Sequence, residues 1–179
     1  VDQKLKDQGS LDNQIGLNND LSKQEIIANA FSFHSKGELE EAEKYYQLFL
    51  SQGHSDPRIL VNYGVICKQK RQNKKAIELY QRCISEYPFY AQVYSNLGNL
   101  YREIQKIDEA KELTLKAIEL DPDRAESHSN IGEIYLLEED FVEAEAAFKR
   151  AIELKNDFYK PYCNLANLYL NQKKLSEAQ

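Results

Sequence analysis

Apolar residues recur along this chain at the spacing of one helix face. From Tyr94 onward they fall at i, i+3, i+4 and i+7, the series that predicts an amphipathic helix. A polar turn follows each series, and a second apolar stripe then begins, as at Ala144. The chain is therefore predicted to form helix pairs joined by tight turns. The positions of the first stripe are Tyr94, Leu97, Gly98 and Tyr101, then His128, Ile131, Gly132 and Tyr135, then Tyr162, Leu165, Ala166 and Tyr169.

The helix pairs repeat every 34 residues. Alanines recur at this spacing at Ala42, Ala76, Ala110, Ala144 and Ala178, as do Gly64, Gly98 and Gly132, and Pro88 and Pro122. A fixed period of this length is typical of stacked repeats. One frame accounts for all of these residues, with repeats at 23–56, 57–90, 91–124 and 125–158 and a partial fifth repeat at 159–179.

Residues 1–22 differ in composition from the repeats. They are rich in Gln, Asn, Asp and Lys and poor in aromatic residues, so we expect a polar linker or disordered lead-in. This segment ends at Ser22, and Glu25 follows three residues later. That spacing predicts a capping box at the start of the first helix.

The small residues at the eighth and twentieth positions of each repeat have a packing role. Gly or Ala there lets the two helices of a pair approach closely, while larger residues fill the space between neighbouring pairs. A single pair cannot bury its apolar face, so the repeats must stack. The sequence therefore predicts an all-α solenoid.

This pattern resembles the tetratricopeptide repeat family over residues 23–179. The third repeat shows the family signature as Tyr94, Leu97-Gly98, Tyr101, Ala110 and Pro122. The resemblance implies antiparallel helix pairs in a right-handed superhelix, as in the multi-repeat proteins of bacteria. The chain departs from the signature at Thr114, which replaces an aromatic residue, and it contains no Trp.

An asparagine recurs at the sixth position of four consecutive repeats. This position lies about 200° around the helix from the core residue at position four, on the side that lines the concave face of the array. An Asn amide both donates and accepts hydrogen bonds, so it can pair with a peptide backbone of any sequence. The ladder consists of Asn62, Asn96, Asn130 and Asn164, with Asn99 and Asn167 added at position nine.

The spacing of the ladder suits an extended ligand. Adjacent inner helices lie about 9–10 Å apart, and an extended peptide rises about 3.3 Å per residue, so one Asn would meet roughly every third peptide residue. The arrangement resembles the ladder in the repeat arm of protein O-N-acetylglucosamine transferases, which implies that these asparagines bind a substrate backbone. In the alternative interpretation they solvate the groove or make local hydrogen bonds.

Other groove residues would select among ligands. Phe31 makes the N-terminal end of the groove more apolar. Lys68 and Arg102, at position twelve of successive repeats, would hold an acidic group if they are more than solvated surface charges. Glu133 makes the fourth repeat acidic. We therefore expect a protein or peptide ligand of mixed charge.

The resemblance allows one known function of the family to be tested. The clamp that grips the acidic C-terminal tail of chaperones needs Lys at position five in two of its repeats. Position five of this chain holds Ile27, Val61, Ser95, Ser129 and Cys163. We therefore predict that the chain lacks this clamp.

Composition excludes several other classes. The net charge of −6 argues against a nucleic-acid partner, and no apolar run is long enough to insert in a membrane. Cys67, Cys83 and Cys163 have no zinc-site spacing and are expected to be unpaired thiols in a reducing compartment. No catalytic, metal or cofactor motif is visible. A cytoplasmic location is the default, since no signal peptide is present.

Two functions remain open at this stage. The first is a non-enzymatic scaffold that binds an extended segment of a partner protein. The alternative is the substrate-recruiting arm of a glycosyl-, sulfo- or methyltransferase, because the sequence lacks Met and stops at Gln179 inside a repeat, as a fragment would. The incomplete fifth repeat is also expected to promote self-association through its uncapped face.

Overall fold

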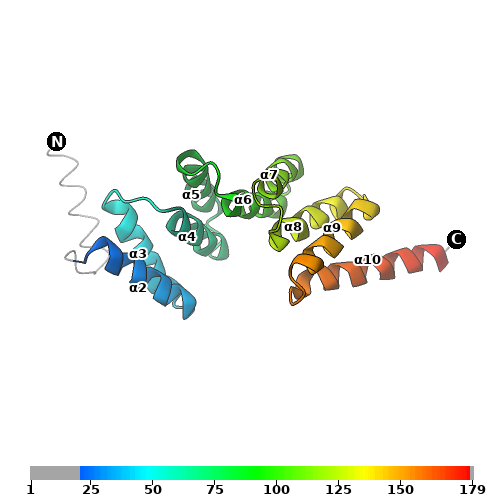
Figure 1. Cartoon of the computed structure of the whole chain (residues 1–179), viewed down its shortest axis with the longest axis horizontal. Helices are drawn as coiled ribbons and strands as arrows, with labels where there is room; N and C mark the ends of the chain where they lie inside the picture. Colours follow the sequence, from blue (N-terminus) through cyan, green and yellow to red (C-terminus); the bar gives the residue numbers. More distant parts are fainter. Residues whose placement is uncertain (1–20, 178–179) are drawn as a thin grey trace. The chain divides into compact units, whose positions relative to one another are not determined.

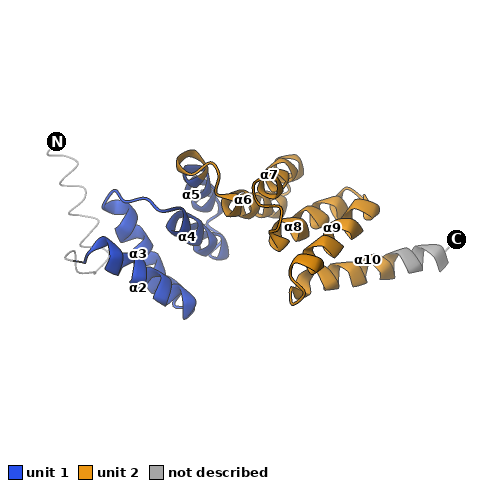
Figure 2. Ribbon diagram, in the orientation of Figure 1, with its two compact units in different colours: residues 1–83 blue, residues 84–179 orange. Residues whose placement is uncertain are grey.

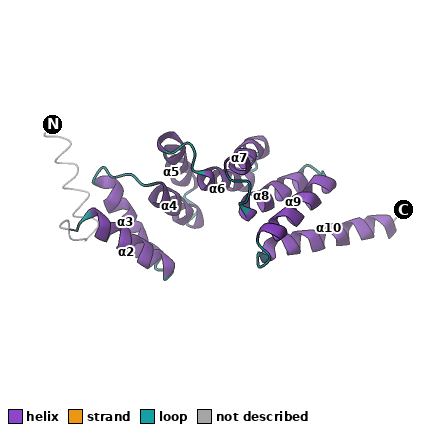
Figure 3. Cartoon of the chain, in the orientation of Figure 1, coloured by secondary structure: helices purple, strands orange, loops and turns teal. Residues whose placement is uncertain are grey.

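The described part of the chain is built from helices alone. The computed structural model describes residues 21–177, and it describes side chains as far as residue 171. These residues form no strand (Figures 1 and 3). The helices are α2 Lys23–Ser35, α3 Leu39–Ser51, α4 Pro57–Gln69, α5 Asn73–Glu86, α6 Ala91–Glu103, α7 Ile107–Leu120, α8 Ala125–Leu137, α9 Phe141–Leu154 and α10 Tyr159–Glu177. The predicted all-α fold of paired helices is thus confirmed.

The first helix begins where the sequence predicts. The Ser22 hydroxyl accepts a hydrogen bond from the Glu25 backbone N–H, and the Glu25 carboxylate accepts one from the Ser22 N–H at 2.8 Å. This reciprocal capping box satisfies two amide groups that a helix start leaves unpaired. The rest of the predicted lead-in, residues 1–20, lies outside the described residues.

The turn inside each of the first four repeats uses one left-handed residue. Gly37, Arg71, Gln105 and Glu139 occupy the same repeat position, with φ angles of 77°, 59°, 65° and 61°. After α6, the Gln105 N–H donates to the Arg102 carbonyl and the Lys106 N–H donates to the Tyr101 carbonyl. These two bonds form a Schellman motif, which pairs the last carbonyls of the helix.

The chain divides into two compact units, residues 1–83 and residues 84–179 (Figure 2). In the first unit, α2 packs on α3, and α3 contacts α4. Gly64 of α4 lies against the ring of Tyr80 of α5, so closely that a Cβ on Gly64 would lie 2.3 Å from the ring. The core of this unit includes the fully buried side chains of Ile26, Tyr46, Phe49, Ile59 and Ile66.

The second unit contains two helix pairs and α10. Here α6 packs on α7 and α8 on α9, while α8 also contacts α6 and α10. Gly98 faces Thr114 and Gly132 faces Phe148, at distances that leave no room for a Cβ. The predicted role of the eighth position is therefore confirmed at each of the three glycines.

The last helix departs from the repeat pattern. The repeat spacing predicts a turn near residue 173, but α10 continues to Glu177. Since the described residues supply no second helix to pair with α10, continued helical bonding is the way its backbone groups are satisfied.

Candidate functional site

The ladder residue of the first unit is part of a buried hydrogen-bond chain. The half-buried Asn62 side chain bonds to the hydroxyl of the fully buried Tyr46. That hydroxyl lies 2.7 Å from Nδ1 of His34. Phe31, which the sequence predicts at the apolar end of the groove, packs edge-on against Tyr46 with 6.3 Å between the ring centroids. Asn62 and Phe31 thus share a neighbour in the core.

The three ladder residues of the second unit differ in their surroundings. Asn96 on α6 is half-buried and makes no side-chain hydrogen bond to another described residue. Asn130 on α8 is 8% exposed, and its Nδ2 donates to the Ser95 carbonyl and hydroxyl oxygens at 3.3 and 3.2 Å. Asn164 on α10 donates to Glu133 Oε1 at 3.4 Å. Two of the three side chains therefore link neighbouring inner helices.

A charged network crosses the inner helices of the second unit. Glu133 on α8 pairs with Arg102 of α6 at 2.8 Å and with Lys160 of α10 at 2.6 Å. Arg102 also donates to Asn99 Oδ1 at 2.8 Å. The Glu133 and Arg102 side chains are 11% and 19% exposed. Glu133 is thus neutralised by two cations, so it does not by itself make this repeat acidic.

One buried donor in this network lacks an acceptor. Arg102 Nε is buried and has no hydrogen-bond partner among the described residues. Such groups are rare in folded proteins and mark places where a water or a ligand acceptor would be accommodated. Lys68 is half-buried and belongs to the first unit, whereas Arg102 belongs to the second. Their predicted joint role in holding an acidic ligand group therefore stays a prediction. Asn167 is exposed on α10.

Residue four of several repeats makes a bond that sequence reasoning missed. The hydroxyls of Tyr94 and Tyr162 donate to the carbonyls of Pro88 and Asn156, and Nε2 of His128 lies 2.8 Å from the Pro122 carbonyl. All three bonds span six residues and tie the start of a helix to the loop before it. His128, which occupies a position of the first apolar stripe, therefore makes a hydrogen bond as well.

The cysteines and the remaining candidate chemistry fit structural roles. Cys67 and Cys83 are fully buried, and Cys163 is exposed. Burial raises the pKa of Cys67 to about 11, which keeps its thiol protonated and unreactive. Across the described residues, no group of three His, Cys, Asp or Glu side chains is arranged to hold a metal ion. Over the same residues, no helix has the length and hydrophobicity needed to cross a bilayer.

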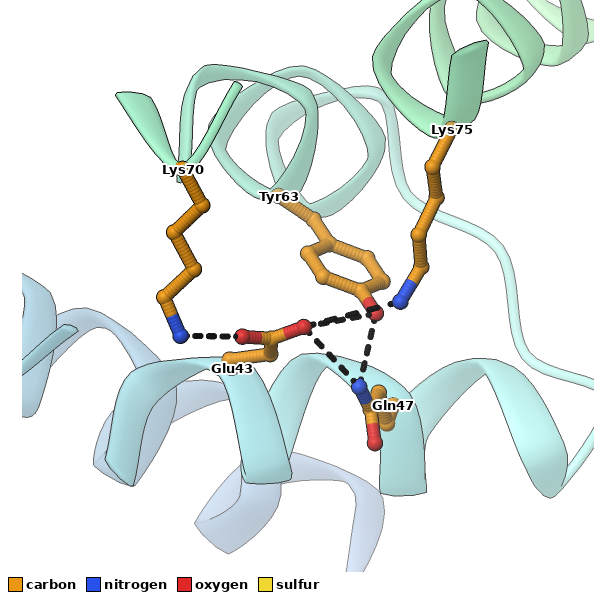
Figure 4. A network of polar contacts seen from close by, with 5 residues as sticks. All are labelled: Glu43, Gln47, Tyr63, Lys70 and Lys75. Carbon is orange, nitrogen blue, oxygen red and sulfur yellow. Dashed lines mark hydrogen bonds and ion pairs between the residues drawn. The ribbon is translucent and has the colours of Figure 1, made fainter. Parts of the chain in front are cut away.

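A second polar cluster lies in the first unit, and no sequence pattern pointed to it (Figure 4). Glu43 on α3 pairs with Lys70 at 2.7 Å and with Lys75 at 3.5 Å. Tyr63 of α4 donates to Glu43 and accepts from Gln47, and the Lys75 ammonium lies 4.7 Å from the centre of the Tyr63 ring. The partners are separated by up to 32 residues, so helix packing alone brings them together.

The charge of Glu43 is stabilised by its cations. Burial acts to raise the pKa of Glu43, but the hydrogen bond and charge of Lys70 and the charge of Lys75 outweigh it, so the pKa lies below its usual value. The network therefore holds an ionised carboxylate between three helices.

Comparison with known proteins identifies the repeats. Models of the tetratricopeptide repeat match residues 57–90 and 90–157, which together exceed half of the chain. No curated protein matches the chain by sequence.

Solved structures share the fold at low identity. PilF of Pseudomonas aeruginosa aligns with a TM-score of 0.73 and 19% identity over 87% of this chain and 71% of its own. YrrB, described as a TPR protein with an unusual peptide-binding site, aligns with a TM-score of 0.67 and 18% identity over 93% and 85%. The first TPR domain of Spaghetti (RPAP3), bound to an HSP90 peptide, aligns with a TM-score of 0.61 and 17% identity over 65% and 93%.

Proposed function

Because the chain belongs to the tetratricopeptide repeat family, we propose that it is a protein-interaction scaffold that binds an extended peptide along its inner asparagines. The observation that carries the proposal is the recurrence of an amide side chain at one position of four successive repeats. Two solved structures with this fold are described by their peptide site or bound peptide, which supports a peptide as the class of ligand.

The asparagines contribute in different ways. Asn96 has its whole amide available to a ligand backbone. Asn130 and Asn164 use Nδ2 within the protein and keep Oδ1 as an acceptor for a peptide N–H. Internal bonds also fix these two side chains before the ligand arrives, which lowers the entropy lost on binding. The ladder is thus both a structural and a binding element in this proposal.

The charged residues set the preference of the second unit. Arg102 and Lys160 balance Glu133, so this part of the groove favours a ligand of mixed or no net charge. In the first unit, Phe31 supplies an apolar contact and Lys68 a cation.

Substitution of ladder residues tests the proposal. Peptides selected from a random library on the intact protein provide the ligand, and fluorescence anisotropy provides the Kd. The double variant Asn96→Ala and Asn167→Ala removes two amides that make no side-chain hydrogen bond to another described residue, so each loss costs about 1 kcal/mol of binding. We expect the Kd to rise about tenfold or more, with circular dichroism unchanged.

The matched control is Asn156→Ala, in the exposed loop before α10. It removes the same chemical group away from the ladder, and its Kd should equal that of the unmodified protein. Equal Kd values for the ladder variant and the control would refute a binding role for the ladder.

We also propose that the chain self-associates through α10. Tyr159, Tyr162, Tyr169 and Leu170 are 76%, 46%, 44% and 56% exposed on this helix, an unusual concentration of apolar surface. The chain should show concentration-dependent light scattering. Changing Tyr159 and Leu170 to Lys should abolish it, whereas Leu115→Lys, which replaces an exposed leucine on α7, should not. Scattering that is independent of concentration would contradict this proposal.

A further inference from the structure

The strongest cluster of positive charge in this acidic chain lies at the corner between α4 and α5. Residues 68–75 read KQKRQNKK, five cations in eight positions, in a chain of net charge −6. We use the name basic corner for the cations that follow the end of α4 and those on α5. They are Lys70, Arg71, Lys74, Lys75 and Arg82.

Two adjoining hollows lie beside the basic corner, both within the first unit. One, of about 500 Å³, is formed by α3, α4 and α5 and has Lys75 and Arg82 among its lining residues. The other, of about 650 Å³, is lined by Arg71, Lys74 and Lys75. Lys75 and Glu78 line both hollows, so the two form one continuous surface.

The larger part of the first hollow is apolar. Leu50 of α3 and Leu79 of α5 lie on its walls, together with the ring of Tyr63. Tyr63 and Leu79 are 2% and 8% exposed, so core packing fixes the position of these lining residues. An aliphatic side chain that enters here would be flanked by the cations Lys75 and Arg82.

The charge of this surface is positive after its own ion pairs are counted. Glu43 pairs with Lys70 and Lys75 and fixes their positions, and Glu78 is the one carboxylate among the described lining residues. Arg71 and Lys74 are exposed to solvent. Lys70, Arg71, Lys74 and Lys75 are four cations against these two carboxylates. They leave a net positive surface, which would attract an acidic ligand.

We infer that the basic corner and its hollows form a second interaction surface, for an acidic peptide segment that carries an aliphatic residue. The aliphatic side chain enters the hollow beside Leu50 and Leu79, and the flanking carboxylates meet Arg71 and Lys74. A nucleic acid would also satisfy the cations. It is less well matched, because the floor aromatic Tyr63 is buried and offers no face for a base to stack on.

This surface is separate from the asparagine face. Asn62 and Tyr63 are adjacent on α4, so their side chains point about 100° apart. The Asn62 side chain forms a hydrogen bond with Tyr46, whereas the Tyr63 hydroxyl forms hydrogen bonds with Glu43 and Gln47. One ligand at each surface would let the chain hold two partners.

The test uses a fluorescein-labelled, C-terminally amidated peptide of Asp and Glu with one central Leu. The intact chain should bind it, and binding should weaken as NaCl is raised from about 0.05 M to about 0.5 M. The variant Arg71→Glu with Lys74→Glu should raise the Kd about tenfold or more. Replacement of the central Leu of the probe by Ser should weaken binding without any change to the protein.

Two controls separate this surface from other effects. Lys23→Glu with Lys36→Glu changes the net charge of the chain by the same amount through exposed residues of the first unit, and it should leave the Kd unchanged. Asn96→Ala, on the asparagine face, should also leave it unchanged. The inference would be overturned if the two charge-reversal variants weakened peptide binding equally, or if replacing the central Leu of the probe left the Kd unchanged. It would also be overturned if an oligothymidylate strand bound more tightly than the peptide.

Discussion

At the scale of single residues, close helix contact depends on the eighth position of each repeat. Gly132 lies where an added Cβ would be 2.6 Å from Phe148 Cε1, and the Phe148 ring is fully buried. The ring is held by the core around it, so it cannot move aside at little cost. The same position holds a buried Ala30 in the first repeat, where the surrounding packing accommodates the methyl group.

The Gly132→Ala variant should therefore be less stable than the unmodified chain. Alanine gains up to about 1 kcal/mol from helix propensity, and overpacking costs about 1–3 kcal/mol, so we expect a net loss of about 1 kcal/mol in urea unfolding. Adding Phe148→Leu should relieve the clash, so the two substitutions should be less damaging together than their separate effects predict. A Gly132→Ala protein of unchanged or higher stability would contradict the close-contact explanation.

At the scale of helices and turns, the backbone of Gln105 is strained. It ends the α6 Schellman motif in the left-handed region, where its equivalent in the first repeat is Gly37. For a residue with a Cβ, this conformation raises the free energy of the folded chain by about 1–2 kcal/mol. Gln105 is exposed, so its side chain offsets little of that cost.

The Gln105→Gly variant should accordingly be more stable, by up to about 1 kcal/mol, as measured by thermal unfolding. The matched control is Gln81→Gly, which places glycine in the exposed interior of α5 and should cost about 1 kcal/mol. If both glycines destabilise the chain, then the turn is not under backbone strain.

The Glu43 cluster joins three helices and makes stability depend on pH. Because the pKa of Glu43 is lower in the folded chain than in the unfolded chain, its contribution is present above about pH 4.3 and is lost as the pH falls through the folded value. Lys70 and Lys75 are partly exposed, so Glu43→Gln should cost about 1 kcal/mol at neutral pH, and the difference should shrink near pH 3. Urea unfolding at both pH values gives the comparison.

Glu112→Gln, an exposed carboxylate on α7, is the control for this effect. Its stability should follow that of the unmodified chain at both pH values. A Glu43→Gln protein that stays equally destabilised near pH 3 would show that side-chain packing, rather than charge, accounts for the loss.

The sequence predicted the helices, their pairing and the close contacts at Gly64, Gly98 and Gly132, because these features recur with the 34-residue period of the repeats. It did not predict the bonds of Asn130 to Ser95 or of Glu133 to Lys160. These join residues on different helices, and they depend on side-chain directions and helix placement that no local spacing encodes. The same holds for Glu43, whose partners lie on two other helices.

At the scale of the whole molecule, each compact unit has its own core. Phe148 and Leu168 pack in a cluster of the second unit, whereas Tyr46 and Phe49 are buried in the first. In arrays of repeats, stability is a sum of repeat and nearest-neighbour terms. A local change should therefore be felt most strongly nearby.

Hydrogen exchange can show this locality. Gly132→Ala should speed exchange of the backbone amides in α8, α9 and α10 and leave those of α2 and α3 unchanged. Gly64→Ala should have the complementary effect in the first unit. Uniform acceleration through all described helices in either variant would show that the chain unfolds as one cooperative body.

The most direct measurement of the central claim combines a change in the protein with a change in the ligand. A library-selected peptide is methylated at one backbone nitrogen at a time, and its Kd is measured for the unmodified chain and for Asn96→Ala. If Asn96 binds the backbone, one methylated position will weaken binding to the unmodified chain about fivefold to tenfold and have no further effect on Asn96→Ala. If every methylation weakens both proteins equally, then Asn96 does not bind the peptide backbone and the proposed role of the ladder is wrong.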